Sequence, residues 1–213
     1  MILLTGFEPF GADSINPSWQ AVQLAREILR REGYTAEAVE LPCVFGESVD
    51  VLVESIARYQ PNVIVCAGLA GGRERLSLER VAINCDDARI PDNKGQRPID
   101  EEVVPGGPSA YFSKLPVKAA LRNLQVAGIK AEVSQSAGTY VCNHVFYALM
   151  HHLAADTETR GGFVHVPYSA EQLQAESTAP SLPLGVMAEG IAVIARTAVG
   201  TGLDVKLSAG AIH

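Results

Sequence analysis

The apolar and polar positions of the chain alternate between short apolar runs and longer stretches with helical spacing. Runs rich in β-branched and aliphatic residues predict strands at 1–5, 36–41, 62–67, 131–134 and 162–166. Stretches with apolar residues on one face predict helices at 17–33, 45–58, 116–127, 141–155 and 184–199. The run at 63–67 is apolar at every position, which is typical of a strand covered on both faces.

The alternation of strands and helices predicts a three-layer α/β/α sandwich with a mostly parallel central sheet, of the phosphorylase-like or hydrolase-like kind. The first helix has clear boundaries, because Asn16 can cap it, Pro17 suits its first position and Gly33 ends it. A chain of 213 residues has the size of one or two domains. We expect residues 1–213 to form a single domain.

Residues 68–107 interrupt the alternation. This stretch contains two Gly-Gly pairs, three prolines, many charged residues and one short apolar run at 81–83, and it predicts a long irregular segment. Such segments are uncommon in compact domains unless they carry function. Because this one leaves the carboxyl end of the strand predicted at 62–67, where ligands of open α/β sheets bind, we expect the chemistry there.

Composition and charge exclude several classes of protein. The formal charge is −7 and 6% of residues are aromatic, so the chain lacks the basic surface of a nucleic-acid-binding protein. No apolar run reaches the length of a membrane span, and the N-terminus does not resemble a signal peptide. The four cysteines form no C-x-x-C pair, and no histidine motif typical of metal sites occurs. We expect a cytoplasmic protein with free thiols, no metal and no cofactor.

Cys142 differs from the other three cysteines in its position. The segment 136–144 passes from a predicted strand through Gly138 into a predicted helix, so that Cys142 falls in the first helical turn. Free backbone N–H groups and the helix dipole at that turn favour a thiolate, lower its pKa and can hold an oxyanion. A cysteine that only packs in the core fits this position equally well.

A nucleophilic cysteine requires a base, and the topology favours His165. His165 lies at the carboxyl end of the strand that follows the helix of Cys142, which brings it to the same edge of a parallel sheet. His144 is two residues from Cys142 on a helix and faces elsewhere, whereas His151 lies further along that helix. His213 is the last residue. A core histidine bonded to the backbone remains an alternative for His165.

A cysteine–histidine pair also requires a group that orients the imidazole. The irregular segment offers five carboxylates for this role: Glu74, Glu79, Asp86, Asp87 and Asp92. Glu79 precedes the short apolar run 81–83, and the others have looser surroundings. Spacing alone does not choose among them, and a solvated carboxylate explains each one.

Five segments together resemble pyroglutamyl-peptidase I, also called pyrrolidone-carboxylate peptidase. They are 6–11 (GFEPFG), 79–84 (ERVAIN), 87–93 (DARIPDN), 137–144 (AGTYVCNH) and 165–168 (HVPY). They stand in the order of the family and span nearly the whole chain. The members are cytoplasmic cysteine peptidases that remove N-terminal pyroglutamate, fold as α/β/α sandwiches and assemble as tetramers or dimers.

The resemblance implies a role for four residues. Cys142 is implied as nucleophile and His165 as general base and acid. Glu79 is implied to orient His165, and Arg89 to stabilise the oxyanion together with the Cys142 backbone N–H. The implied pocket for the pyroglutamyl ring consists of Phe7, Phe10, Asn16, Leu69, Ile90, Tyr140 and Val141.

The implied partners are peptides that begin with pyroglutamate. This residue is an uncharged lactam, so its pocket needs no carboxylate to hold an ammonium group. Lactam N–H and C=O groups would pair with the backbone near 68–70. The chain departs from the family pattern at Leu69, Cys43 and Tyr140, where glutamine, threonine and phenylalanine are common, which bears on affinity and not on the type of reaction.

Two other functions fit the same architecture. A nucleoside phosphorylase-like transferase would build a phosphate site from Arg73, Arg75, Arg80 and Arg89 and would need no thiol. A protein that only binds pyroglutamyl peptides would keep the fold without turnover. A turnover assay with a thiol-blocking reagent separates these functions from a cysteine peptidase.

Overall fold

The computed structural model describes residues 1–11, 13–173 and 177–210. Its central sheet contains β1 (Ile2–Phe7), β2 (Ala36–Leu41), β3 (Val63–Leu69), β4 (Leu76–Glu79), β7 (Ala131–Ser134) and β8 (Arg160–Val166). Two small sheets pair β5 (Val81–Ile83) with β6 (Ala110–Phe112), and β9 (Tyr168–Ser169) with β10 (Ser181–Leu182). The helices are α1 (Pro17–Arg31), α2 (Glu47–Tyr59), α3 (Val117–Val126), α4 (Val141–His152) and α5 (Leu184–Gly200).

The strand order in the central sheet is β2-β1-β3-β8-β4-β7. The first four strands are mutually parallel, β4 runs antiparallel to β8, and β7 is parallel to β4. All five predicted strands and all five predicted helices are present, with helix ends that differ by a few residues. The predicted mostly parallel α/β fold is confirmed.

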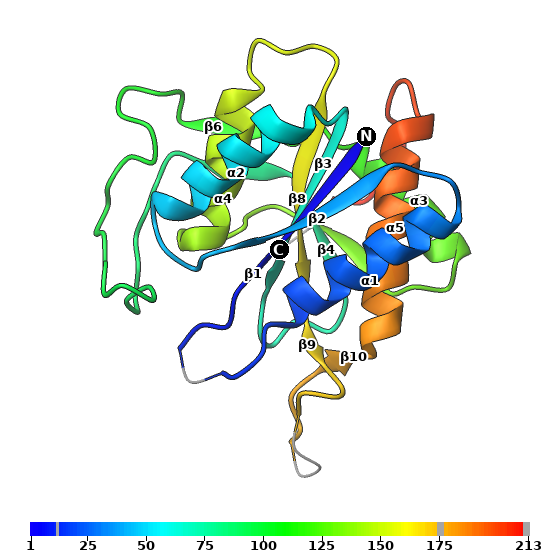
Figure 1. Ribbon diagram of the computed structural model, residues 1–213, viewed down its shortest axis with the longest axis horizontal. Helices are drawn as coiled ribbons and strands as arrows, with labels where there is room; N and C mark the ends of the chain where they lie inside the picture. Colours follow the sequence, from blue (N-terminus) through cyan, green and yellow to red (C-terminus); the bar gives the residue numbers. More distant parts are fainter. Residues whose placement is uncertain (12, 174–176, 211–213) are drawn as a thin grey trace.

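Helices cover both faces of the sheet (Figure 1). Buried residues of α1, α3 and α5 pack on one face in one hydrophobic cluster, whereas those of α2 and α4 pack on the other face in a second cluster. Successive residues of a strand therefore point alternately to the α5 side and to the α4 side. This alternation decides which side chains can meet at the site.

The prediction of one long irregular segment at 68–107 is wrong in part. Residues 76–79 form β4, which lies inside the central sheet between β8 and β7. Leu76 and Leu78 are fully buried on the α5 side, and Ser77 and Glu79 point to the α4 side. A four-residue strand with two polar positions gives only a weak apolar signal, although the alternation is that of a strand.

Within the described ranges, no helix has both the length and the hydrophobicity needed to cross a membrane.

Candidate active site

Two strands bring the predicted base His165 and its orienting carboxylate Glu79 to one face of the sheet, and a third strand places Gly68 on the same face. Val164 and Leu78 pack on the α5 side, so their neighbours His165 on β8 and Glu79 on β4 point to the α4 side. Gly68 on β3 pairs with His165 in the parallel register of β3 and β8. The face that carries Gly68, His165 and Glu79 is the face that α4 covers.

Glu79 and His165 form a buried pair. Glu79 Oε1 lies 2.7 Å from His165 Nδ1, and the two side chains are 0% and 4% exposed. A carboxylate accepts hydrogen bonds, so it fixes the tautomer with the proton on Nδ1. Nε2 is then the nitrogen that can accept a proton from another group. The arrangement is that of an oriented general base.

Cys142 lies in the first turn of α4, directly over Gly68. A Cβ added to Gly68 would lie 2.7 Å from the Cys142 sulfur, so the sulfur occupies the space that any larger residue at 68 would need. The same added atom would lie 2.9 Å from the ring of Phe163, whose centroid is 5.0 Å from that of His165. The sulfur therefore sits over the strand partner of His165, on the same face of the sheet.

The expected lowering of the Cys142 pKa is not found. Burial is the largest effect on this thiol and raises its pKa above the ordinary value. The negative charge of Glu79 raises it further, while the Arg73 guanidinium lowers it without offsetting the burial. The expectation from the helix terminus is wrong because it ignores the loss of hydration. At neutral pH the thiol keeps its proton, which must pass to a base during attack.

A small cavity adjoins Cys142. It is lined by Phe7, Phe10, Asn16, Cys43, Leu69, Tyr140, Val141 and Cys142. Six of the seven predicted pocket residues are in this set, and Ile90 is not. The volume is about 30 Å³, room for about one or two water molecules, so a five-membered lactam requires the walls to move apart.

Ile90 and Arg89 border a larger, neighbouring cavity of about 650 Å³. Tyr140 lines both cavities. The Tyr140 hydroxyl donates to the Pro91 carbonyl at 3.1 Å, which satisfies the extra polar group at this position. Arg89 is exposed, and the cation that acts on the Cys142 thiol is Arg73.

Asn16 holds one wall of the small cavity in place. Its Oδ1 accepts from the Ser18 N–H and hydroxyl, which caps α1 as expected, and its Nδ2 donates to the Glu8 carbonyl. Ser18 Oγ in turn accepts from the N–H of Phe7 at 3.1 Å. These bonds fasten the end of β1, which supplies Phe7 to the cavity, and the following loop, which supplies Phe10.

Arg73 is a residue that the sequence did not single out for this site. Its Nη1 lies 2.8 Å from Glu79 Oε1, the oxygen that also contacts His165. A second guanidinium nitrogen donates to the Ser136 carbonyl at 3.4 Å, just before α4. Nothing in the spacing indicates this contact. Only the charge on Arg73 and its place after β3 could have suggested a carboxylate partner.

The remaining candidates have other partners or stay at the surface. His144 bonds Asp86 and His151 bonds the Tyr111 hydroxyl, so neither is free to serve Cys142. Asp92 accepts from backbone N–H groups, including that of Phe45. Glu74 and Asp87 are exposed. His213 lies outside the described residues.

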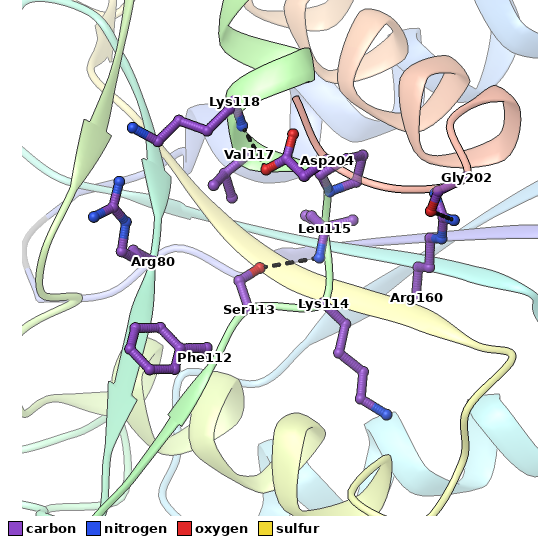
Figure 2. A pocket seen from close by; sticks show the side chains of 11 residues that line it. Arg80, Phe112, Ser113, Lys114, Leu115, Val117, Lys118, Arg160, Gly202 and Asp204 are labelled. Atoms are coloured by element: carbon purple, nitrogen blue, oxygen red, sulfur yellow. Dashed lines mark hydrogen bonds between the residues drawn. The ribbon is translucent and has the colours of Figure 1, made fainter. Parts of the chain in front are cut away.

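The four arginines proposed for a phosphate site do not converge. Arg73 bonds Glu79, Arg75 lies near Glu74 and Glu132, and Arg89 borders the cavity of Ile90. Arg80 lines a separate cavity of about 460 Å³ beside α3 (Figure 2).

The other charged side chains that line the cavity in Figure 2 already form hydrogen bonds with protein groups. Arg160 donates to the carbonyls of Ala198 and Gly202, and Lys114 donates to those of Leu153 and Asp156. Asp204 accepts from the N–H groups of Lys118 and Ala119 and so covers the start of α3. In the described part of the chain, no group of three or more His, Cys, Asp or Glu side chains could hold a metal ion.

Comparison with known proteins identifies the family. The family model described as pyroglutamyl peptidase (Peptidase C15) matches residues 1–201. Pyrrolidone-carboxylate peptidases from Escherichia fergusonii and Streptomyces coelicolor are 48% and 50% identical to this chain, over 100% of it and 99% of each of them.

Solved structures agree with this result. Pyroglutamyl peptidase I of Bacillus amyloliquefaciens has a TM-score of 0.89 and 43% identity, over 96% of this chain and 98% of that one. The pyrrolidone carboxyl peptidase of Thermococcus litoralis has a TM-score of 0.88 and 33% identity, over 97% and 98%. The chain therefore belongs to the pyroglutamyl peptidase family, a family of cysteine peptidases.

Proposed function

We propose that this protein hydrolyses the amide bond after an N-terminal pyroglutamyl residue, with Cys142 as nucleophile and His165 as general base and acid. One observation carries the proposal: the Cys142 sulfur lies over Gly68, the strand partner of His165, and Glu79 holds the His165 ring at 2.7 Å. Nucleophile, base and orienting carboxylate thus share one face of the sheet. Family membership supports the same reaction.

The reaction proceeds in two stages. The Cys142 thiol transfers its proton to His165 Nε2 as the sulfur attacks the pyroglutamyl carbonyl carbon. The N–H of Cys142 stabilises the oxyanion. Arg89, which borders the neighbouring cavity, shares this role on the strength of the family resemblance alone, and the intermediate collapses as His165 protonates the leaving amine. Water then gives a proton to His165 and attacks the thioester, which releases pyroglutamate and restores the thiol. The raised pKa of Cys142 makes the proton transfer to His165 necessary.

The small cavity suits an uncharged ring. Phe7, Phe10, Leu69 and Val141 contribute apolar surface, and no carboxylate is among the described residues that line the cavity. An ordinary peptide N-terminus carries an ammonium group, whose burial without a partner is costly. Pyroglutamate has lost that charge by cyclisation, so the cavity favours it over proline, whose ring amine is charged.

The test compares pyroglutamyl and prolyl amides of a fluorescent amine, with Cys142→Ser as the critical variant. We expect the native enzyme to release amine from the pyroglutamyl substrate only, and Cys142→Ser to reduce release to background. Cys85→Ser is the matched control, because Cys85 is a free, half-buried thiol outside the cavity. Substantial turnover by Cys142→Ser, or turnover that requires phosphate, would contradict the assignment.

We also propose a cytoplasmic location and a homo-oligomeric state, dimer or tetramer. All four cysteines are free, which suits a reducing compartment. Phe112 and Val126 are large apolar side chains with 72% and 84% exposure, as at surfaces that another subunit covers. Light scattering coupled to gel filtration measures the assembly.

A further inference from the structure

His144 forms a second buried histidine–carboxylate pair, one that the mechanism does not use. Its Nδ1 lies 2.7 Å from Asp86 Oδ2, and the residues are 8% and 5% exposed. Its Nε2 lies 3.0 Å from the backbone N of Gly46, just before α2. Both ring nitrogens are therefore occupied, each by a different segment of the chain.

These contacts determine which nitrogen of the His144 imidazole carries the proton. The Gly46 N–H can only donate, so Nε2 must accept and carries no proton. The proton of the neutral ring is then on Nδ1, which donates to Asp86. A ring held in this way cannot transfer protons without losing a bond. It is suited to joining α4, the start of α2 and the segment of Asp86.

The position of His144 connects this junction to the nucleophile. The N–H of His144 donates to the Tyr140 carbonyl at 3.1 Å, which closes the first turn of α4 around Cys142. The Phe45 ring meets both ends of this turn edge-on, with centroids 5.3 Å from His144 and 5.5 Å from Tyr140. The Tyr140 backbone caps α4 without a side-chain cap bond, so the turn depends on such outside contacts.

We propose that His144, held by Asp86 and the Gly46 N–H, is a positioning residue that fixes the first turn of α4 and with it the sulfur and N–H of Cys142. The proposal rests on the proposed role of Cys142 as nucleophile. Since a misplacement of about 1 Å can cost about a hundredfold in rate, loss of the His144 contacts lowers kcat.

Three variants separate the contacts of His144. His144→Ala removes both. In His144→Asn the amide reaches the place of Nδ1 and keeps a donor for Asp86, and in His144→Gln it reaches the place of Nε2 and keeps an acceptor for Gly46. The matched control is His151→Asn, because His151 lies on the same helix, bonds the Tyr111 hydroxyl and is exposed.

The experiment measures kcat, KM and thermal midpoint for each variant, well below its midpoint of unfolding. We expect kcat of His144→Ala to fall about tenfold to a hundredfold, with KM changed less than about threefold. His144→Asn and His144→Gln each recover part of kcat, and His151→Asn matches the native enzyme. Should His144→Ala not fold, the kcat values of the Asn and Gln variants decide.

Two results would overturn the proposal. One is a lowered thermal midpoint with native kcat in the folded variants, which means that His144 only stabilises the fold. The other is a rise in KM with unchanged kcat, which means that His144 shapes the pocket and not the position of the sulfur. If the native enzyme itself lacked Cys142-dependent turnover, the proposed function would fail instead.

Discussion

One carboxylate oxygen of Glu79 accepts hydrogen bonds from two side chains. His165 Nδ1 and Arg73 Nη1 lie 2.7 and 2.8 Å from Oε1, and the Glu79 side chain is fully buried. A buried carboxylate without a countercharge would be strongly destabilising. Arg73 supplies that charge, so Glu79 can keep its negative charge beside the imidazole and stabilise the imidazolium that forms during attack.

We expect Glu79→Gln to lower turnover by about tenfold or more, but less than His165→Ala does. The amide keeps the size of the side chain and loses the charge that orients His165 and stabilises its protonated form. The measurement is the pH dependence of kcat for both variants. A profile for Glu79→Gln that overlies that of the native enzyme would show that Glu79 has no orienting role.

The thiol of Cys142 gives a second prediction at this scale. Its pKa is raised by burial, so at neutral pH the thiolate fraction is smaller than that of a free cysteine. Alkylation of Cys142 by iodoacetamide without substrate therefore rises by about tenfold per pH unit from pH 7 into the alkaline range. Mass spectrometry of the Cys142 peptide follows the rate. A plateau already reached near pH 7 would mean that the thiolate is preformed.

At the scale of elements, β3 and the first turn of α4 come into close contact at Gly68. The glycine is needed because the sulfur of Cys142 and the ring of Phe163 fill the space where a side chain would be. The helix can therefore bring its first turn down onto the strand beside His165. A larger residue would force α4 away from the sheet.

We expect Gly68→Ala to destabilise the protein by about 1–3 kcal/mol and to abolish most activity. The added methyl group would lie 2.7 Å from the sulfur and displace it from His165. Gly185→Ala is the control, because a side chain there meets nothing within 4 Å and the position is helical. Denaturant unfolding and turnover are measured for both. Native activity in Gly68→Ala would contradict the close packing.

Hydrophobic periodicity could predict most of this architecture. It failed for features that depend on contacts between segments far apart in the sequence. The runs at 62–67 and 162–166 identify β3 and β8 and hence the edge where His165 lies. β4 was missed because its alternation covers only four residues. The contact of Arg73 with Glu79 joins two segments that no local pattern relates. The sign of the Cys142 pKa shift depends on burial, which the linear sequence does not reveal.

At the scale of the whole molecule, buried thiols make stability depend on pH. Burial raises the pKa of Cys43 to about 12 and that of Cys66 to about 12. In the unfolded chain the same thiols ionise near pH 8.5. Between these values the unfolded state has lost protons that the folded state keeps, so stability present below about pH 8.5 is lost as the pH rises toward 12.

We expect the free energy of unfolding to fall by about 1.4 kcal/mol per pH unit for each such thiol above about pH 8.5. Urea unfolding at several alkaline pH values, with a reducing agent present, measures the slope. Cys66→Ala isolates one thiol from the other groups that titrate there, and its slope should be shallower by that amount. Equal slopes for the two proteins would contradict the burial of Cys66.

β8 is enclosed on both sides, by β3 running the same way and β4 running the opposite way. Its backbone amides are therefore among the last to be released by local opening, and we expect those of 163–166 to exchange with deuterium more slowly than those of the loops at 85–93. The imidazole is thus anchored to a strand that pairs with a neighbour on each side. Substitutions meant to change substrate preference should be made in the loops, because substitutions in β8 would destabilise the whole fold.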